Sequence, residues 1–210
     1  MTLNDKVPCM ELTQILLTYG PLGEDCLADL NRVAKVARFN AGDYLIRQGE
    51  ECKSFYFVRD GILRVCHRTP KKEDTLLFGT DGDIYTPLQC WIGHEISDFS
   101  LTPVIESEVY SISYTDINAL LDKYPEFVKW MMLLCAGQLR ALELKYIKFC
   151  NLSPEERLIE FMSKSDSRLG LMTGKTISRK VPLKMIASWL GVRPETLSRI
   201  RRKLVKKTDI

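Results

Sequence analysis

Three polar side chains near the C-terminus share the spacing of one helix face. Glu195, Ser198 and Arg199 stand at positions i, i+3 and i+4, and Pro194 suits the first position of a helix. An arginine can donate two hydrogen bonds to guanine, and a carboxylate can accept one from cytosine N4. These residues, the base-reading trio, are therefore predicted to contact base edges. The ordinary alternative is a surface helix with an ion pair between Glu195 and Arg199.

Basic side chains surround the trio. The net charge is only +3, but residues 1–150 hold 16 Lys and Arg against 21 Asp and Glu, whereas residues 151–210 hold 14 against 6. A basic segment joined to an acidic one favours a polyanionic partner, although a solvated basic tail would have the same composition. The predicted phosphate contacts are Arg193, Thr196, Arg201, Arg202 and Lys203, with Lys206 and Lys207 beyond them.

The segment Val181–Leu204 has the pattern of a helix-turn-helix. A short helix is predicted over Leu183–Leu190, a turn at Gly191, and a second helix from Pro194. Arg193 takes the N-cap position, where Ser or Thr would be more favourable, and we expect it to exchange helix stability for a phosphate contact. Core positions of the two helices are Ile186, Ala187 and Leu190, then Leu197, Ile200 and Leu204.

A long helix is predicted before this segment. Pro125 suits its first turn, and residues 126–150 contain no Pro and one Gly. A heptad pattern of apolar residues, the dimer seam, comprises Val128, Met132, Cys135, Leu139, Leu142, Tyr146 and Phe149. A second apolar set comprises Phe127, Trp130, Met131 and Leu134. We interpret one face as covered by the N-terminal domain and the other by a second copy; a single core helix is the alternative.

The N-terminal part predicts helices followed by strands. Residues 11–37 show helical spacing, and residues 115–124 show it again. Between them, short β-branched or aromatic runs alternate with turn signals, which is typical of an all-β sandwich or jelly roll. The predicted strands are Tyr44–Ile46, Phe55–Val58, Ile62–Cys66, Thr75–Phe78 and Val109–Ile112.

The expected fold class is α+β, in three parts. Residues 1–124 form a β-roll sensor domain with N-terminal helices, residues 125–150 the dimerisation helix, and residues 151–210 the helix-turn-helix domain. Ser153 and Glu156 predict a capping box for a helix that starts at Pro154. Residues 163–180 are expected to form a turn with a weak hairpin.

Several function classes are disfavoured by composition and spacing. No apolar run approaches the length of a membrane span, and Met1–Glu11 lacks the apolar core of a signal peptide, so we expect a cytoplasmic protein. The seven cysteines contain no C-x-x-C, which disfavours zinc ribbons and iron–sulfur clusters. Gly170–Thr176 resembles a P-loop but has three residues between its glycines instead of four.

We also expect no enzymatic activity, no cofactor and no metal. The chain has only two histidines, His67 and His94, and no nucleophile–base constellation is recognisable. Cys90 and His94 could supply two ligands to a metal or haem, but two ligands alone do not define a site.

The helix-turn-helix segment resembles that of the Crp/Fnr transcription regulators. Gly191–Arg199 matches the G-x-x-x-E-T-x-S-R pattern of their recognition helix, Phe39–Gly61 is similar to the start of their cyclic-nucleotide-binding-type β-roll, and residues 126–150 to their dimerisation helix. The resemblance covers nearly the whole chain. It implies a homodimer whose base-reading trio reads a TTGA-like half-site of a palindrome. Its implied partners are double-stranded DNA, RNA polymerase and a small-molecule effector in the β-roll.

Three departures from the family pattern qualify these expectations. Tyr85–Leu88 and Ser97-Asp98 replace the Gly-Glu-Leu and Arg-Ser motifs that bind ribose and cyclic phosphate; because Asp98 would repel a phosphate, cyclic AMP is disfavoured. Only Cys9 lies where the iron–sulfur branch has clustered cysteines. The sequence ends six residues after Leu204, without the usual β-wing. The alternative function is a ligand-binding or protein-interaction module with a degenerate helix-turn-helix that no longer binds DNA.

Overall fold

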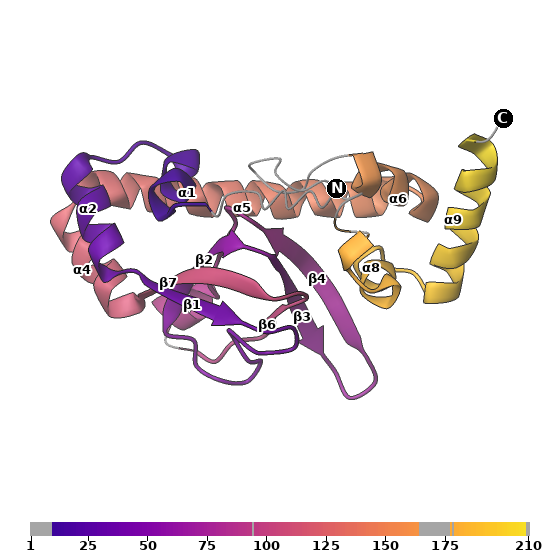
Figure 1. Ribbon diagram of the computed structural model, residues 1–210, viewed down its shortest axis with the longest axis horizontal. Coiled ribbons are helices and arrows are strands. Elements are labelled where there is room, and N and C mark those ends of the chain that lie inside the picture. The colour runs from indigo at the N-terminus through magenta and orange to yellow at the C-terminus, as the bar shows by residue number, and fades with distance from the viewer. Residues whose placement is uncertain (1–9, 94, 164–176, 178, 209–210) are drawn as a thin grey trace, which may run out of the picture.

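The computed structural model describes residues 10–93, 95–163, 177 and 179–208, with backbone only for residues 205–208. Figure 1 shows two β-sheets beneath one long helix, with the C-terminal helices at one end. The strands are β1 (Lys35–Phe39), β2 (Ser54–Asp60), β3 (Ile62–Arg68), β4 (Glu73–Thr80), β5 (Ile84–Tyr85), β6 (Ser100–Pro103) and β7 (Ser107–Ser113). The helices are α1 (Leu12–Tyr19), α2 (Glu24–Val33), α3 (Leu88–Ile92), α4 (Tyr114–Lys123), α5 (Pro125–Asn151), α6 (Pro154–Ser163), α8 (Leu183–Trp189) and α9 (Pro194–Thr208).

The strands form a β-sandwich of two antiparallel sheets. One sheet has the order β1-β7-β2-β5 and the other β4-β3-β6. Buried residues from both sheets, among them Val58, Leu63, Leu101 and Val109, pack together in one cluster. This arrangement confirms the expected all-β sandwich, because alternating apolar residues of each strand must be covered by the opposite sheet.

Four of the five predicted strands are present, whereas β1, β5 and β6 were not predicted. The predicted strand Tyr44–Ile46 is wrong, since only Ile46 makes an isolated bridge, to Leu101. The predicted helical segment 11–37 ends at Val33, and Lys35–Phe39 is instead strand β1, paired with β7. Cross-strand pairing overrides the local pattern there. The short helix α3 was not predicted.

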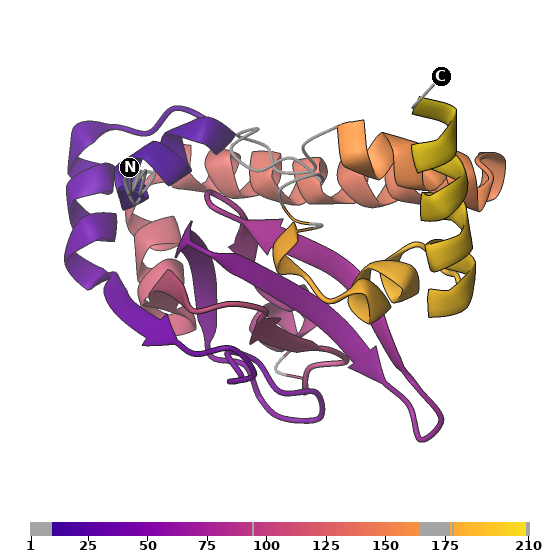
Figure 2. The same ribbon diagram turned by 45° about the vertical axis from the view of Figure 1, so that its right-hand side comes forward.

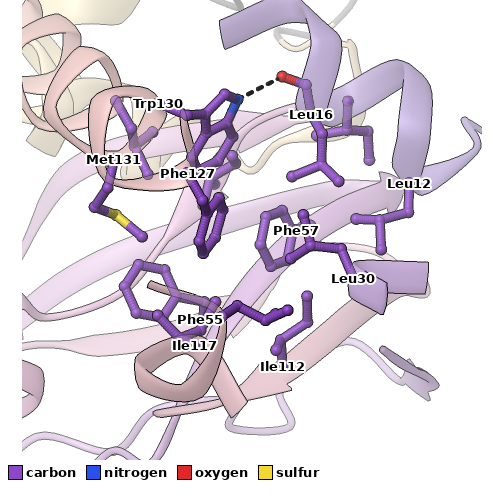
Figure 3. Packing of buried hydrophobic residues seen from close by; sticks show 14 of the residues in the cluster. Leu12, Leu16, Leu30, Phe55, Phe57, Ile112, Ile117, Phe127, Trp130 and Met131 are labelled. Atoms are coloured by element: carbon purple, nitrogen blue, oxygen red, sulfur yellow. Dashed lines mark hydrogen bonds between the residues drawn. The ribbon is translucent and has the colours of Figure 1, made fainter. Parts of the chain in front are cut away.

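Helices α1, α2, α4 and the first half of α5 cover the outer face of the larger sheet. Phe55 and Phe57 of β2 point toward them, while Val58 packs between the sheets. Figure 3 shows the centre of this packing, where the Trp130 indole Nε1 donates a 2.8 Å hydrogen bond to the Leu16 carbonyl. The β2 strand is therefore buried on both faces, which explains its continuous apolar sequence.

The C-terminal elements follow the predicted order. Helix α6 begins with the predicted capping box, because Glu156 accepts from the Ser153 amide at 2.7 Å and Ser153 Oγ accepts from the Glu156 amide at 3.3 Å. The weak hairpin expected over 163–180 lies mostly outside the described residues, as does the P-loop-like segment 170–176; Ile177, Arg179 and Lys180 are helical instead of extended. Of the described helices, none is long and apolar enough to cross a membrane.

The turn between α8 and α9 requires a glycine. Gly191 has φ +69°, in the left-handed region, and a Cβ at this position would lie 2.7 Å from Phe149 Cε2. The turn therefore allows α9 to leave α8 while the chain passes close to the end of α5.

We predict that Gly191→Ala destabilises the protein more than Gly49→Ala. Gly49 also has a positive φ, +82°, but nothing lies within 4 Å of a Cβ there. Gly49→Ala should therefore lower the free energy of unfolding by about 1–2 kcal/mol through backbone strain. Gly191→Ala should lose roughly another 1–3 kcal/mol because Phe149 must move. Urea unfolding measures both losses, and equal losses would contradict the contact with Phe149.

Candidate nucleic-acid interface and effector cavity

Helix α9 presents the base-reading trio away from its packed face. Leu197 is buried, and Ile200 and Leu204 pack against the same cluster as the core of α8. Glu195 and Arg199 are exposed on the other side, and Ser198 is half-buried. Figures 1 and 2 place α9 at the end of the molecule farthest from α2. One face of α9 is therefore core, and of the trio Glu195 and Arg199 face solvent.

Most of the predicted phosphate contacts are also exposed. Arg193, Arg201 and Arg202 are exposed, and Thr196 is half-buried. Among the side chains that the structure describes, neither Glu195 nor Arg199 takes part in a hydrogen bond or ion pair, so the ordinary i, i+4 pair is not formed.

Unlike the other predicted phosphate contacts, Lys203 forms an ion pair within the described part of the chain. Its Nζ lies 2.7 Å from a carboxylate oxygen of Glu155 in α6. This exposed ion pair connects α9 to the start of the C-terminal domain, so Lys203 already has an anionic partner within the chain. An exposed pair of this kind contributes little stability.

The predicted dimer seam lies mainly on the uncovered side of α5. Met132, Leu139 and Tyr146 are 68%, 60% and 71% exposed, and Val128 and Leu142 are also exposed. The second apolar set on α5, at positions 127, 130, 131 and 134, is buried against the β-sandwich. Cys135, between the two faces, is half-buried.

Phe149, the last residue of the predicted seam, also contacts its own chain. The guanidinium of Arg157 lies 4.6 Å from its ring centroid, and Gly191 lies beneath the ring edge. The sequence pattern did not distinguish Phe149 from the other residues of the seam. Heptad spacing describes one helix only, so it cannot show that the turn at Gly191 packs against this ring.

Arg157 of α6 joins α5 to the helix-turn-helix and was not predicted as important. Its guanidinium donates to the carbonyls of Phe149 at 3.1 Å, Leu152 at 2.8 Å and Leu190 at 3.0 Å. These carbonyls lie at the C-terminal ends of α5 and α8, where helix carbonyls lack partners within the helix. Arg157 therefore holds the two helix ends together.

Helix α8 docks on the edge strand β4 of the smaller sheet. The Thr75 amide donates to Ser188 Oγ at 2.8 Å. Lys145 of α5 donates a short hydrogen bond to the Leu76 carbonyl and lies 5.1 Å from the ring centroid of Trp189. The first helix of the helix-turn-helix therefore contacts both the β-sandwich and α5.

A cavity of about 650 Å³ lies between the β-sandwich, α5 and the C-terminal helices. Apolar and aromatic side chains from all three parts line it, including Phe78 and Tyr85 from the sandwich, Leu142 from α5, and Phe161 and Trp189 from the C-terminal helices. Its size and predominantly apolar wall are typical of small-molecule sites.

On its β-sandwich side, the described wall of this cavity lacks the cationic side chains of an anion site. No Lys or Arg of the sandwich is among the described residues that line it. Asp98, expected to repel a phosphate, is exposed and outside the described lining, and its carboxylate accepts a 3.5 Å hydrogen bond from Gln89, which is part of the lining. Ser97 is buried, and its Oγ donates to the Phe99 carbonyl at 2.8 Å.

Cys90 is buried in the sandwich, and burial raises the pKa of its thiol. A raised thiol pKa disfavours the thiolate that metals bind. His94, its suggested co-ligand, lies outside the described residues, and within the described residues no group of three metal-ligating side chains occurs.

Two comparisons by sequence each match less than half of the chain. Residues 36–124 match the family model of the cyclic nucleotide-binding domain. The human potassium/sodium hyperpolarization-activated cyclic nucleotide-gated channel 1 is 29% identical over 87 residues, which is 41% of this chain and 9% of the channel. The aligned segment thus spans less than a tenth of the length of that relative.

Solved structures extend the likeness to most of the chain. FixK2 from Bradyrhizobium japonicum matches with a TM-score of 0.70 and 16% identity, covering 84% of this chain and 86% of FixK2. The c-di-GMP responsive global regulator CLP from Xanthomonas campestris matches with a TM-score of 0.67 and 15% identity, covering 89% and 93%. At sequence identities of 15–16%, the likeness shows that the fold is shared. Residues 36–124 therefore match a cyclic nucleotide-binding domain, within a chain that shares the fold of FixK2 and CLP.

Proposed function

We propose that this protein is a homodimeric, sequence-specific DNA-binding transcription regulator of the Crp/Fnr type. The observation that carries the proposal is the arrangement of α9. Leu197 anchors one face, while Glu195 and Arg199 stand exposed on the other without a described partner. A helix that enters the major groove needs such a free polar face, because its side chains must bond to base edges instead of to one another.

Dimerisation is the second part of the proposal. Two recognition helices must lie about one DNA turn apart, roughly 34–36 Å, to contact both half-sites of a palindrome. The exposed apolar seam on α5 supports pairing with a second copy, since exposed heptad positions on a long helix are typical of coiled-coil contacts. We infer that α5 holds the two α9 helices in register on a TTGA-like palindrome.

Regulation by a small molecule is the third part. An effector can act only by binding one dimer geometry more tightly than another. The cavity supports this, because its wall includes Phe78 of β4, Leu142 of α5 and Trp189 of α8. Contact with RNA polymerase is proposed from the resemblance alone.

Arg199→Ala should weaken binding to the cognate duplex by about 1–3 kcal/mol and relax the preference at one base position. The loss comes from the two donors of the guanidinium. Selection from a random duplex pool identifies the cognate site, and gel shifts on cognate and scrambled duplexes measure the change. Lys71→Ala, an exposed charge in the β3–β4 hairpin, is the control and should leave binding unchanged. Equal weakening on both duplexes would show that Arg199 contacts only phosphate.

Arg201→Ala should weaken binding to all duplexes alike. An exposed arginine that neutralises one phosphate releases about one counterion, so the slope of log affinity against log salt should become shallower by about one. The measurement is a salt titration on cognate and scrambled duplexes. Arg201 is preferred over Lys203 because the latter is paired with Glu155. An unchanged slope would remove Arg201 from the contact surface.

Leu139→Glu should convert the dimer to a monomer, because it places a charge in the middle of the exposed seam. Leu17→Glu on α1 is the matched control: Leu17 is also exposed, at 48%, but lies outside the seam. Sedimentation velocity measures the mass of each variant. A dimer that survives Leu139→Glu, or a monomeric parent protein, would contradict the assigned seam.

A further inference from the structure

The cavity between the β-sandwich, α5 and the C-terminal helices, about 650 Å³ in volume, is rich in aromatic side chains. Rings come from the sandwich, from the end of α5 and from the C-terminal helices: Phe78, Tyr85, Phe99, Phe149, Phe161 and Trp189. Protein interiors are otherwise packed without voids of this size, and cavities with apolar walls bind apolar molecules. The cavity therefore favours a ligand that presents rings and aliphatic surface to this wall.

The charged side chains of the wall near the C-terminal helices already have partners within the chain. Lys148 Nζ lies 3.0 Å from a carboxylate oxygen of Glu160, so these two charges compensate each other. Lys145 donates a hydrogen bond to the Leu76 carbonyl and lies 5.1 Å from the ring centroid of Trp189. An acid at this end would compete with Glu160 or with a carbonyl for the same ammonium groups.

The other charged side chains of the described wall are also paired. Arg157 donates hydrogen bonds of 2.8 to 3.1 Å to three carbonyls at the ends of α5 and α8. Asp83 accepts a 2.8 Å hydrogen bond from the Thr80 amide. A charged ligand group would have to break one of these interactions or be buried without a partner, and both cost free energy. The wall therefore favours a neutral ligand over an ionic one.

Two neutral polar side chains of the wall have partners within the chain as well. The hydroxyl of Tyr19 donates to the Gly82 carbonyl, and the side-chain amide of Gln138 donates to the Ile84 carbonyl, both at 3.1 Å. Because these groups are already satisfied, the affinity for a ligand must come mainly from the apolar area that it buries.

We propose that this cavity binds a neutral, apolar aromatic molecule of two or three rings, held by packing against the wall without an ionic anchor. Such a ligand contacts Phe78 of β4, Leu142 of α5 and Trp189 of α8 together. It differs in class from a cyclic nucleotide, whose phosphate carries a charge. Only its role as a regulator of DNA binding rests on the proposed function; the binding itself does not.

Two dyes that differ by one charged group test this selectivity. N-phenyl-1-naphthylamine is neutral and fluoresces more strongly in an apolar environment, and 8-anilino-1-naphthalenesulfonate has the same rings with a sulfonate added. In fluorescence titrations of the full chain without DNA, we expect saturable binding of one neutral dye per chain. The sulfonate should bind at least about tenfold more weakly, because its charge finds no uncompensated partner.

Cyclic AMP, added to the complex with the neutral dye, should not displace it. The proposal would be overturned by the absence of saturable binding of the neutral dye, by equal or tighter binding of the sulfonate, or by displacement with cyclic AMP.

A pair of variants locates the bound dye. Ala141→Phe on the α5 wall places a ring in the cavity and should weaken the neutral dye at least about tenfold. Ala119→Phe on α4 lies outside the described lining and should not weaken it. Both alanines are exposed, so neither variant should lower the melting temperature. An unchanged affinity in Ala141→Phe would place the dye on another surface and overturn the proposal.

A second pair tests the reason for the selectivity. Glu160→Gln removes the carboxylate that compensates Lys148, so the sulfonate should bind about threefold more tightly or better, while the neutral dye changes little. Glu143→Gln, at an exposed position of α5 outside the described lining, is the matched control and should change neither affinity. A sulfonate affinity that is the same in both variants would contradict exclusion by paired charges.

Gel shifts on the same samples separate this inference from the proposed function. DNA binding by a chain that does not bind the neutral dye would overturn only the ligand assignment. Dye binding that is lost in Ala141→Phe, together with absent DNA binding, would overturn only the proposed function.

Discussion

Helix α5 has two apolar faces, and a single chain covers only one of them. The N-terminal half packs Phe127, Trp130 and Met131 against the β-sandwich, and Trp130 is fixed further by its bond to Leu16. The other face leaves residues such as Leu139 and Tyr146 in water. Exposed apolar area of this extent is costly, and this is why we propose that a second copy covers it.

The end of α5 determines where the helix-turn-helix lies. Arg157 donates to carbonyls at the ends of α5 and α8, and Gly191 allows the turn to pass under Phe149. Ser188 then accepts from the Thr75 amide of β4. The C-terminal domain is thus bound to both the long helix and the sandwich, and the cavity lies where these three parts meet. A molecule in that cavity therefore contacts the β-sandwich, α5 and the C-terminal helices.

The match of residues 36–124 to a cyclic nucleotide-binding domain supports the fold of this domain more directly than the identity of a ligand. A cyclic phosphate is favoured by cations on the sandwich side, and the described wall there has acidic Asp83, the hydroxyls of Thr80, Thr86 and Tyr85, the amide of Gln89 and apolar side chains, without a Lys or Arg. The cations stand on α5 and α6 instead. The same fold can bind different classes of ligand, because the backbone of the sandwich shapes the cavity and a few side chains determine which ligand binds there.

Much of the fold was readable from the sequence, because periodicity and local caps are properties of neighbouring residues. The heptads of α5, the capping box at Ser153 and the helix-turn-helix spacing around Gly191 were all predicted, and the first two followed from local chemistry alone. Strand β1 was missed because its pairing partner, β7, lies about seventy residues away. Tertiary structure alone brought Thr80, Lys145 and Arg157 to one cavity and paired Lys203 with Glu155, since no local pattern encodes which distant surfaces meet.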